Sequence, residues 1–144
     1  MDRRSFLQNA CLACLSATAM PALIASCSSG RYIAGRLEGD DLVVPLSSFV
    51  DEQGKPRPYI IVTQDQLKQP IAVFRAPEGT YYGVLMRCTH RGADLQVVGT
   101  RLECPAHGSV FGSEGAVIEG PASAPLRGFP IVERDGLLRI SLKA

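Results

Sequence analysis

The sequence lacks an excess of charge of either sign and, beyond its first thirty residues, lacks long apolar runs. Its 144 residues include 15 basic and 14 acidic side chains, which gives a formal net charge of +1. A nucleic-acid-binding protein must neutralise many phosphates, so this balance and the absence of a polybasic segment argue against that function. A chain of this length can bury one modest core, which excludes a catalyst built from several domains.

In place of long apolar runs the sequence has many turn residues and short apolar or β-branched segments. Fourteen glycines and ten prolines punctuate the chain, and no segment shows a sustained period of 3.6 residues. The last two segments are joined by Asp135-Gly136, a common hairpin pair. We therefore predict an all-β fold, an antiparallel sandwich of short strands. The expected strands span residues 42–46, 59–63, 71–74, 81–86, 97–102, 110–111, 116–118, 129–132 and 137–142.

The first 26 residues have the order of regions found in a signal peptide. The paired arginines Arg3 and Arg4, followed by Ser-Phe-Leu, resemble the twin-arginine export signal, and a moderately apolar run covers residues 10–25. Residues 23–27 read Leu-Ile-Ala-Ser-Cys and resemble the lipobox of bacterial lipoproteins. We predict that residues 1–26 are removed and that the thiol of Cys27 carries a lipid.

Lipidation of Cys27 would make this an exported bacterial protein, a periplasm-facing lipoprotein held at the membrane through its lipid anchor. Ser28, in place of aspartate after the cysteine, points to the outer membrane as one possible destination. Residues 27–40 would then be the lipidated N-terminus and a tether, and residues 41–144 would be the folded domain. Two alternatives stay open. Cys27 is a simple cleavage-site residue, or residues 10–25 form an uncleaved membrane helix, although they would span only about 24 Å and contain Pro21.

The two histidines of the chain lie close to two of its five cysteines. One loop offers Cys88-Thr89-His90, and a second offers Cys104-Pro105-Ala106-His107. Thiolate is a soft donor and imidazole a borderline one, so each spacing lets a tight loop present both donors to an iron or zinc centre. Other than the expected lipid acceptor, the mature chain keeps cysteine only at this place.

Cys-x-His followed by Cys-x-x-His, with a glycine close behind each histidine, resembles the Rieske [2Fe-2S] family. Residues 120–126, Gly-Pro-Ala-Ser-Ala-Pro-Leu, are similar to the proline-bearing loop that covers the cluster in that family. The resemblance implies a β sandwich with a small cluster-binding subdomain and one [2Fe-2S] cluster per chain. It also implies that Cys88 and Cys104 bind one iron, that His90 and His107 bind the other through Nδ1, and that the Ser109 hydroxyl donates to a bridging sulfide.

The chain departs from the respiratory Rieske proteins at three positions. Ala93 and Ala106 stand where those proteins have two further cysteines, so this chain resembles the ferredoxin-like members that have no disulfide. Phe111 replaces the tyrosine whose hydroxyl donates to a cysteine sulfur in high-potential members. Fewer hydrogen bonds to sulfur stabilise the reduced cluster less. We therefore expect a reduction potential in the middle or lower part of the Rieske span of about −150 to +300 mV.

With both histidines bound to iron, none is left for a catalytic triad or for a mononuclear iron site. The sequence thus predicts one-electron transfer to or from a redox partner such as a cytochrome, an oxidoreductase or an oxygenase component, and no binding of nucleic acid. Arg91, beside His90, is either a solvated surface charge or a contact for that partner. The alternative function is that of a non-redox lipoprotein, either a scaffold or a zinc protein, since the ligand types also permit a Cys₂His₂ zinc site.

Overall fold

A computed structural model of the protein describes residues 31–143, and these fold almost entirely into strands. The predicted signal peptide, Cys27 and residues 28–30 lie outside the described residues. No helix within residues 31–143 is long and apolar enough to cross a membrane. The strands are β1 Tyr32–Ala34, β2 Arg36–Glu38, β3 Asp41–Pro45, β4 Tyr59–Thr63, β5 Ile71–Arg75, β6 Tyr81–Leu85, β7 Gln96–Val98, β8 Arg101–Glu103, β9 Val110–Gly112, β10 Val117–Glu119, β11 Gly128–Phe129, β12 Ile131–Arg134 and β13 Leu137–Ser141. A short 3-10 helix, η1, spans Leu46–Phe49.

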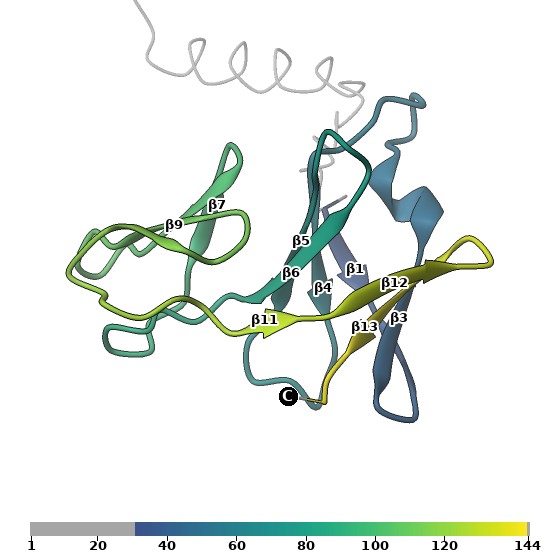
Figure 1. Cartoon of the computed structure of the whole chain (residues 1–144). Coiled ribbons are helices and arrows are strands. Elements are labelled where there is room, and N and C mark those ends of the chain that lie inside the picture. The colour runs from purple at the N-terminus through teal and green to yellow at the C-terminus, as the bar shows by residue number, and fades with distance from the viewer. Residues whose placement is uncertain (1–30, 144) are drawn as a thin grey trace, which may run out of the picture.

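The strands form three sheets, which confirms the predicted all-β class and its small subdomain. A five-stranded sheet has the order β1-β4-β5-β6-β11, and a four-stranded sheet has the order β12-β13-β3-β2. The third sheet, β10-β9-β8-β7, lies in a separate lobe to one side of the other two (Figure 1). The chain enters this lobe after β6 and leaves it before β11, so the lobe is an insertion between two neighbouring strands of the larger sheet.

The five-stranded sheet is buried on both faces, and this arrangement connects the two parts of the fold. Along β4, Ile60 and Val62 pack with residues of the four-stranded sheet β12-β13-β3-β2, whereas Tyr59 and Ile61 belong to a second cluster that extends into the lobe. Successive side chains of a strand point to opposite faces, so a strand covered on both sides reads as a continuous apolar run. The lobe therefore shares a core with the sandwich.

The segment expected to be a tether is part of the fold from residue 32 onward. β1 pairs in parallel with β4, with Tyr32 opposite Ile61, and β2 pairs antiparallel with β3. The prediction was wrong for residues 32–38 because strands of three residues are too short to display a period. The parallel pairing of β1 with β4 is also the exception in a sandwich that is otherwise antiparallel, as predicted.

Two predicted strands are each divided in the structure. The run 97–102 is a hairpin of β7 and β8 that turns at Gly99 and Thr100. The run 129–132 is divided at Pro130, and β11 and β12 on either side of it belong to different sheets. The predicted turn at Asp135-Gly136 is confirmed, since both residues have a left-handed φ, of 54° and 73°, as a type I′ hairpin requires.

Gly35, between β1 and β2, offers a test of how firmly this N-terminal segment is packed. A Cβ atom there would stand 2.6 Å from Leu42 Cδ1 and 2.9 Å from Val62 Cγ1. Gly35→Ala is expected to lower the free energy of unfolding by about 1–3 kcal/mol, since the core must shift to make room. Urea unfolding measures this, with Ala34→Ser at the adjacent exposed position as the control. Equal midpoints for the two variants would show that residues 32–38 contribute little to the fold.

Candidate metal centre

Two loops with the same backbone hydrogen-bonding pattern carry the four predicted ligands. One loop joins β6 to β7, and the other joins β8 to β9. In each loop the cysteine carbonyl accepts from the N–H of a glycine four residues later, and the cysteine N–H donates to the carbonyl five residues later. These bonds are Gly92 N to Cys88 O at 2.7 Å, Cys88 N to Ala93 O at 2.8 Å, Gly108 N to Cys104 O at 2.9 Å and Cys104 N to Ser109 O at 2.9 Å.

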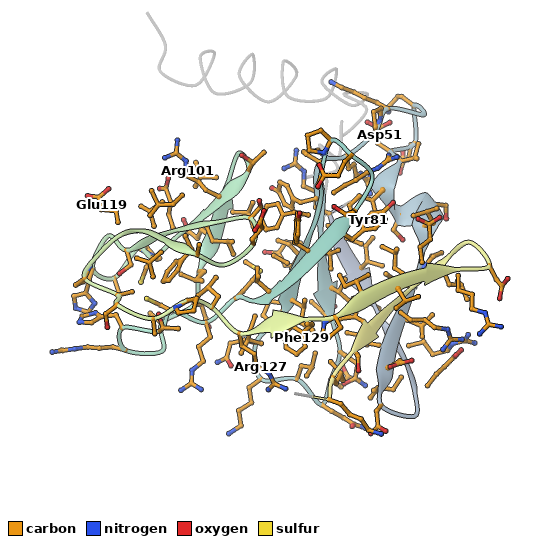
Figure 2. The ribbon with its side chains drawn as sticks, in the orientation of Figure 1. Asp51, Tyr81, Arg101, Glu119, Arg127 and Phe129 are labelled. Carbon is orange, nitrogen blue, oxygen red and sulfur yellow. The ribbon has the colours of Figure 1, made fainter. Side chains whose placement is uncertain are left out.

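The shared pattern explains why both loops contain a glycine close behind the histidine. Gly92 and Gly108 have φ of +78° and +79°, the left-handed region in which a side chain is strained. The two loops therefore present their cysteine and histidine side chains on equivalent backbone frames. Figure 2 shows the lobe with its side chains, and Glu119 marks its outer end.

The structure brings the two cysteines together and the two histidines together. Cys88 and Cys104 are buried free thiols in the core that the lobe shares with the sandwich. The rings of His90 and His107 meet edge to face, with their centroids 4.9 Å apart. His107 is exposed, whereas His90 is partly buried and its Nδ1 atom is buried without a hydrogen-bond partner. A buried imidazole nitrogen without a partner is costly unless something is bound to it.

The environment of Cys104 favours the thiolate, the form that binds metal. Burial raises the pKa of this thiol, but hydrogen bonds from the backbone N–H of Ala106, from the Cys88 thiol and from the backbone N–H of His107 together outweigh burial and hold the pKa below its usual value. Backbone N–H groups aimed at a cysteine sulfur are also the groups that tune a sulfur-ligated metal.

A third loop, residues 120–125, covers the site and is attached to both ligand loops. The backbone N–H of Ala122 donates to Ser109 Oγ at 3.0 Å, and Ser109 is fully buried. Because this hydroxyl accepts from Ala122, its own proton remains available for an acceptor in the site. Thr89 Oγ1 donates to Ala124 O at 2.6 Å. The sequence alone does not reveal this role of Thr89, since its only local signal is a hydroxyl between two predicted ligands.

The donor set fits a binuclear centre better than a single ion. Across residues 31–143, no three His, Cys, Asp or Glu side chains gather closely enough to hold one metal ion. A tetrahedral zinc site needs such a gathering. Two adjacent thiols and two adjacent imidazoles, with one imidazole nitrogen buried and without a partner, instead provide two donors for each of two metals. Two cysteines and two histidines on paired loops are the ligand set of the iron–sulfur domains in which two histidines replace two cysteines on one iron.

Comparison with known proteins identifies the family. The profile of the Rieske [2Fe-2S] domain matches residues 37–130, and the chain belongs to the Rieske [2Fe-2S] family. One [2Fe-2S] cluster is therefore the cofactor of this domain. The match includes both ligand loops and the covering loop, and it begins within β2, so β1 lies before it.

Relatives of two kinds resemble the chain. The oxygenase component of dicamba O-demethylase from Stenotrophomonas maltophilia is 38% identical over 84 residues, which cover 51% of this chain and 25% of that protein. Cytochrome b6-f complex iron-sulfur subunit 2 from Nostoc sp. is 30% identical over 90 residues, which cover 61% of this chain and 44% of that protein. The chain thus spans less than half the length of either relative.

A solved structure of similar size gives a fuller match. A chain in the complex of reduced oxygenase and oxidized ferredoxin in carbazole 1,9a-dioxygenase is 25% identical, with a TM-score of 0.56. The alignment covers 73% of this chain and 95% of that chain. Nearly the whole of that chain therefore has the same fold as part of this protein.

The bond from Thr89 to the covering loop leads to a prediction about how firmly the site is closed. Thr89→Val keeps the shape of the side chain but removes the donor to Ala124 O, at an expected cost of about 0.5–1.5 kcal/mol. We expect iron to be lost faster to a chelator, because the covering loop separates more often from the first ligand loop. Thr100→Val, in the β7–β8 turn, is the matched control. Equal rates of iron loss for the two variants would contradict this role of Thr89.

Proposed function

We propose that this chain transfers single electrons through a [2Fe-2S] cluster held by Cys88 and Cys104 on one iron and by His90 and His107 on the other. The observation that carries the proposal is the buried Nδ1 atom of His90, which has no partner although it lies beside His107 and in the same lobe as two buried free thiols. When bound, the cluster supplies reversible one-electron chemistry. Neutral imidazoles in place of two thiolates raise its potential above that of an all-cysteine cluster.

The residues around the site bind and shield the cluster, and one of them also faces outward. The buried Ser109 hydroxyl supplies a donor inside the site, while the covering loop limits access of water from its side. His107 is exposed, so its ring forms the edge at which a partner protein would receive or give the electron. Electron exchange at an exposed ligand requires no opening of the fold.

We expect a reduction potential in the middle or lower part of the span of about −150 to +300 mV. Phe111 is fully buried beneath the ligand loops and carries no hydroxyl to donate to sulfur, so the reduced state has one fewer source of stabilisation. A redox titration followed by EPR measures the value. A potential near the top of the span would contradict this expectation.

The proposal includes export and lipidation. The twin-arginine pattern at Arg3 and Arg4 suits a protein whose cofactor is inserted in the cytoplasm, because that route carries folded proteins. Lipidation of Cys27 would hold the domain at the periplasmic side of a membrane. Both features rest on the sequence, since these residues lie outside the described residues.

The partner is proposed to be another redox protein. The relatives include an oxygenase component and a subunit of a cytochrome complex, and the similarity to nearly the whole of a chain in an oxygenase–ferredoxin complex favours a small separate carrier or electron-transfer subunit. The zinc or scaffold alternative is not favoured, because the Rieske [2Fe-2S] profile matches both ligand loops and the relatives include electron-transfer and oxygenase proteins.

Spectroscopy on residues 28–144 tests the proposal, since this fragment retains every described strand and lacks only the leader and Cys27. We expect a red-brown protein with two irons and two sulfides, and a reduced-state EPR signal with an average g value of about 1.9, as in histidine-ligated clusters. A colourless folded protein that contains one zinc would show that the fold is present without its redox chemistry.

A further inference from the structure

The described fold begins very close to the expected lipid anchor. Only residues 28–30 separate Cys27 from Arg31, and β1 begins at Tyr32. Fully extended, the chain from Cys27 to Arg31 reaches about 14 Å. This length is similar to the radius of gyration of about 13 Å expected for a domain of this size. If residues 28–40 were all an unstructured tether, the domain could rotate freely about its anchor. Because β1 pairs with β4, the residues from Tyr32 onward belong to the fold, and only residues 28–31 remain as a link.

The position of Arg31 selects one side of the domain, here called the N-terminal face. The backbone N–H of Ile61 donates a hydrogen bond to the Arg31 carbonyl. The Arg31 guanidinium lies over the Tyr59 ring, 4.5 Å from its centroid. Because β1 runs parallel to β4, the chain enters at the end of the sheet where the β5–β6 turn lies. The N-terminal face comprises Arg31, Tyr32, the β5–β6 turn at 76–80 and the β7–β8 turn at 99–100. In Figure 1 both turns stand at the upper side of the molecule.

The surface chemistry of this face suits contact with a bilayer surface. Tyr32 is 58% exposed, and tyrosine is favoured at membrane interfaces. Arg31 and Tyr32 line a hollow of about 410 Å³ whose other walls include Gln96 and Val97 of β7. With the neighbouring β3–β4 loop included, where Figure 2 labels Asp51, the exposed charged residues on and beside the face are Arg31, Lys55, Arg75 and Arg101 against Glu52 and Glu78, a basic excess. Basic side chains are attracted to anionic lipid headgroups.

We propose that the N-terminal face of the lipidated protein lies on the membrane surface and is fixed there by the short link from Cys27 to β1. This inference rests on the proposed lipidation of Cys27. The outer end of the lobe, with the β8–β9 loop that carries Cys104 and His107, lies away from the upper side of the molecule in Figure 1. In this orientation the lobe, with its exposed His107, is held close to the membrane surface, and the redox partner we infer is a protein held at the same membrane.

Fluorescence quenching in vesicles tests the orientation, and the absence of tryptophan from the sequence gives a clean background. The full mature chain is prepared with Tyr32→Trp on the N-terminal face. Two matched controls carry the probe elsewhere: Lys68→Trp in the loop that joins β4 to β5 at the opposite end of the sheet, and Val132→Trp on β12, where the native side chain is 60% exposed. Mass spectrometry first establishes the lipid on Cys27. Vesicles of phosphatidylethanolamine and phosphatidylglycerol then carry a headgroup nitroxide as the quencher.

We expect at least threefold stronger quenching of Tyr32→Trp than of either control. Insertion of about fifteen Gly and Ser residues between Gly30 and Arg31, with a mean span of about 20 Å, should abolish the difference while vesicle binding persists. Equal quenching at all three sites in a lipidated, vesicle-bound protein would overturn the orientation and leave the proposed anchor intact. A mature chain without lipid would overturn both.

Discussion

Cys88→Ser is expected to yield a folded protein with less than a tenth of the iron and sulfide of the wild type. A serine oxygen is a harder and more basic donor than a thiolate, so it replaces the cysteine poorly at iron. The Cys88 thiol also donates to Cys104 and helps to lower the pKa of that thiol. A serine hydroxyl can still donate to Cys104, so the expected loss of iron comes from the missing thiolate ligand itself. Iron and sulfide assays, with the visible spectrum, measure the effect on the same sample.

The matched control for this substitution is Cys27→Ser, which makes the same chemical change at a cysteine outside the site. Cys27→Ser is expected to retain the full complement of iron and to lose only the lipid. Circular dichroism should show the strand content of both variants to be unchanged. A Cys88→Ser protein that keeps two irons and an unaltered EPR signal would overturn the proposed ligand set.

Phe111→Ala is expected to have the largest effect on stability, a loss of about 3–5 kcal/mol. Phe111 is fully buried on β9, pairs across the sheet with Leu102 of β8 and belongs to the core cluster that contains both cysteines. Its truncation leaves a cavity beneath the two ligand loops. Because a domain of this size has a total stability of about 5–15 kcal/mol, the loss removes a large part of it, and the urea midpoint of the apoprotein should fall steeply. Urea unfolding of the apoprotein measures the loss.

Two control variants show whether the loss of stability comes from the cavity left by Phe111 or from any substitution in the domain. Phe111→Leu keeps most of the buried volume and should lose clearly less stability than the alanine variant. Val132→Ala removes a side chain that is 60% exposed on β12 and should change stability by less than about 0.5 kcal/mol. If Phe111→Ala lost less than about 1 kcal/mol, the lobe would not depend on this core, and its loops would have to be held by the cluster alone.

The fold class and the site were predictable because their signals are local. Asp135-Gly136 specifies a hairpin by turn chemistry alone, and the five-residue apolar runs at β4 and β5 indicate strands. The four proposed ligands could be identified because the two histidines of the chain stand at fixed short spacings from two cysteines. The glycine behind each histidine fits the left-handed turn that each loop makes.

The parts that escaped prediction depend on contacts between residues far apart in the sequence. The parallel pairing of Tyr32 with Ile61 has no local signal, and strands of three residues show no period. The bond from Thr89 to Ala124 links residues 35 positions apart, so it follows from the arrangement of the loops and not from either segment alone. Sequence motifs located the site, whereas its closure depends on tertiary structure.

The pairing of β1 with β4 also bears on where a fragment of this protein can begin. The family profile starts at residue 37, but a chain cut there would lack β1 and would leave the backbone groups on one side of β4 without partners. β4 is rich in Ile and Val, and an uncovered strand of this kind is a template for pairing with the same strand of another molecule. By pairing with β4, the three residues of β1 thus prevent self-association through that strand. A fragment that starts at residue 37 should aggregate under conditions in which one that starts at residue 28 stays monomeric.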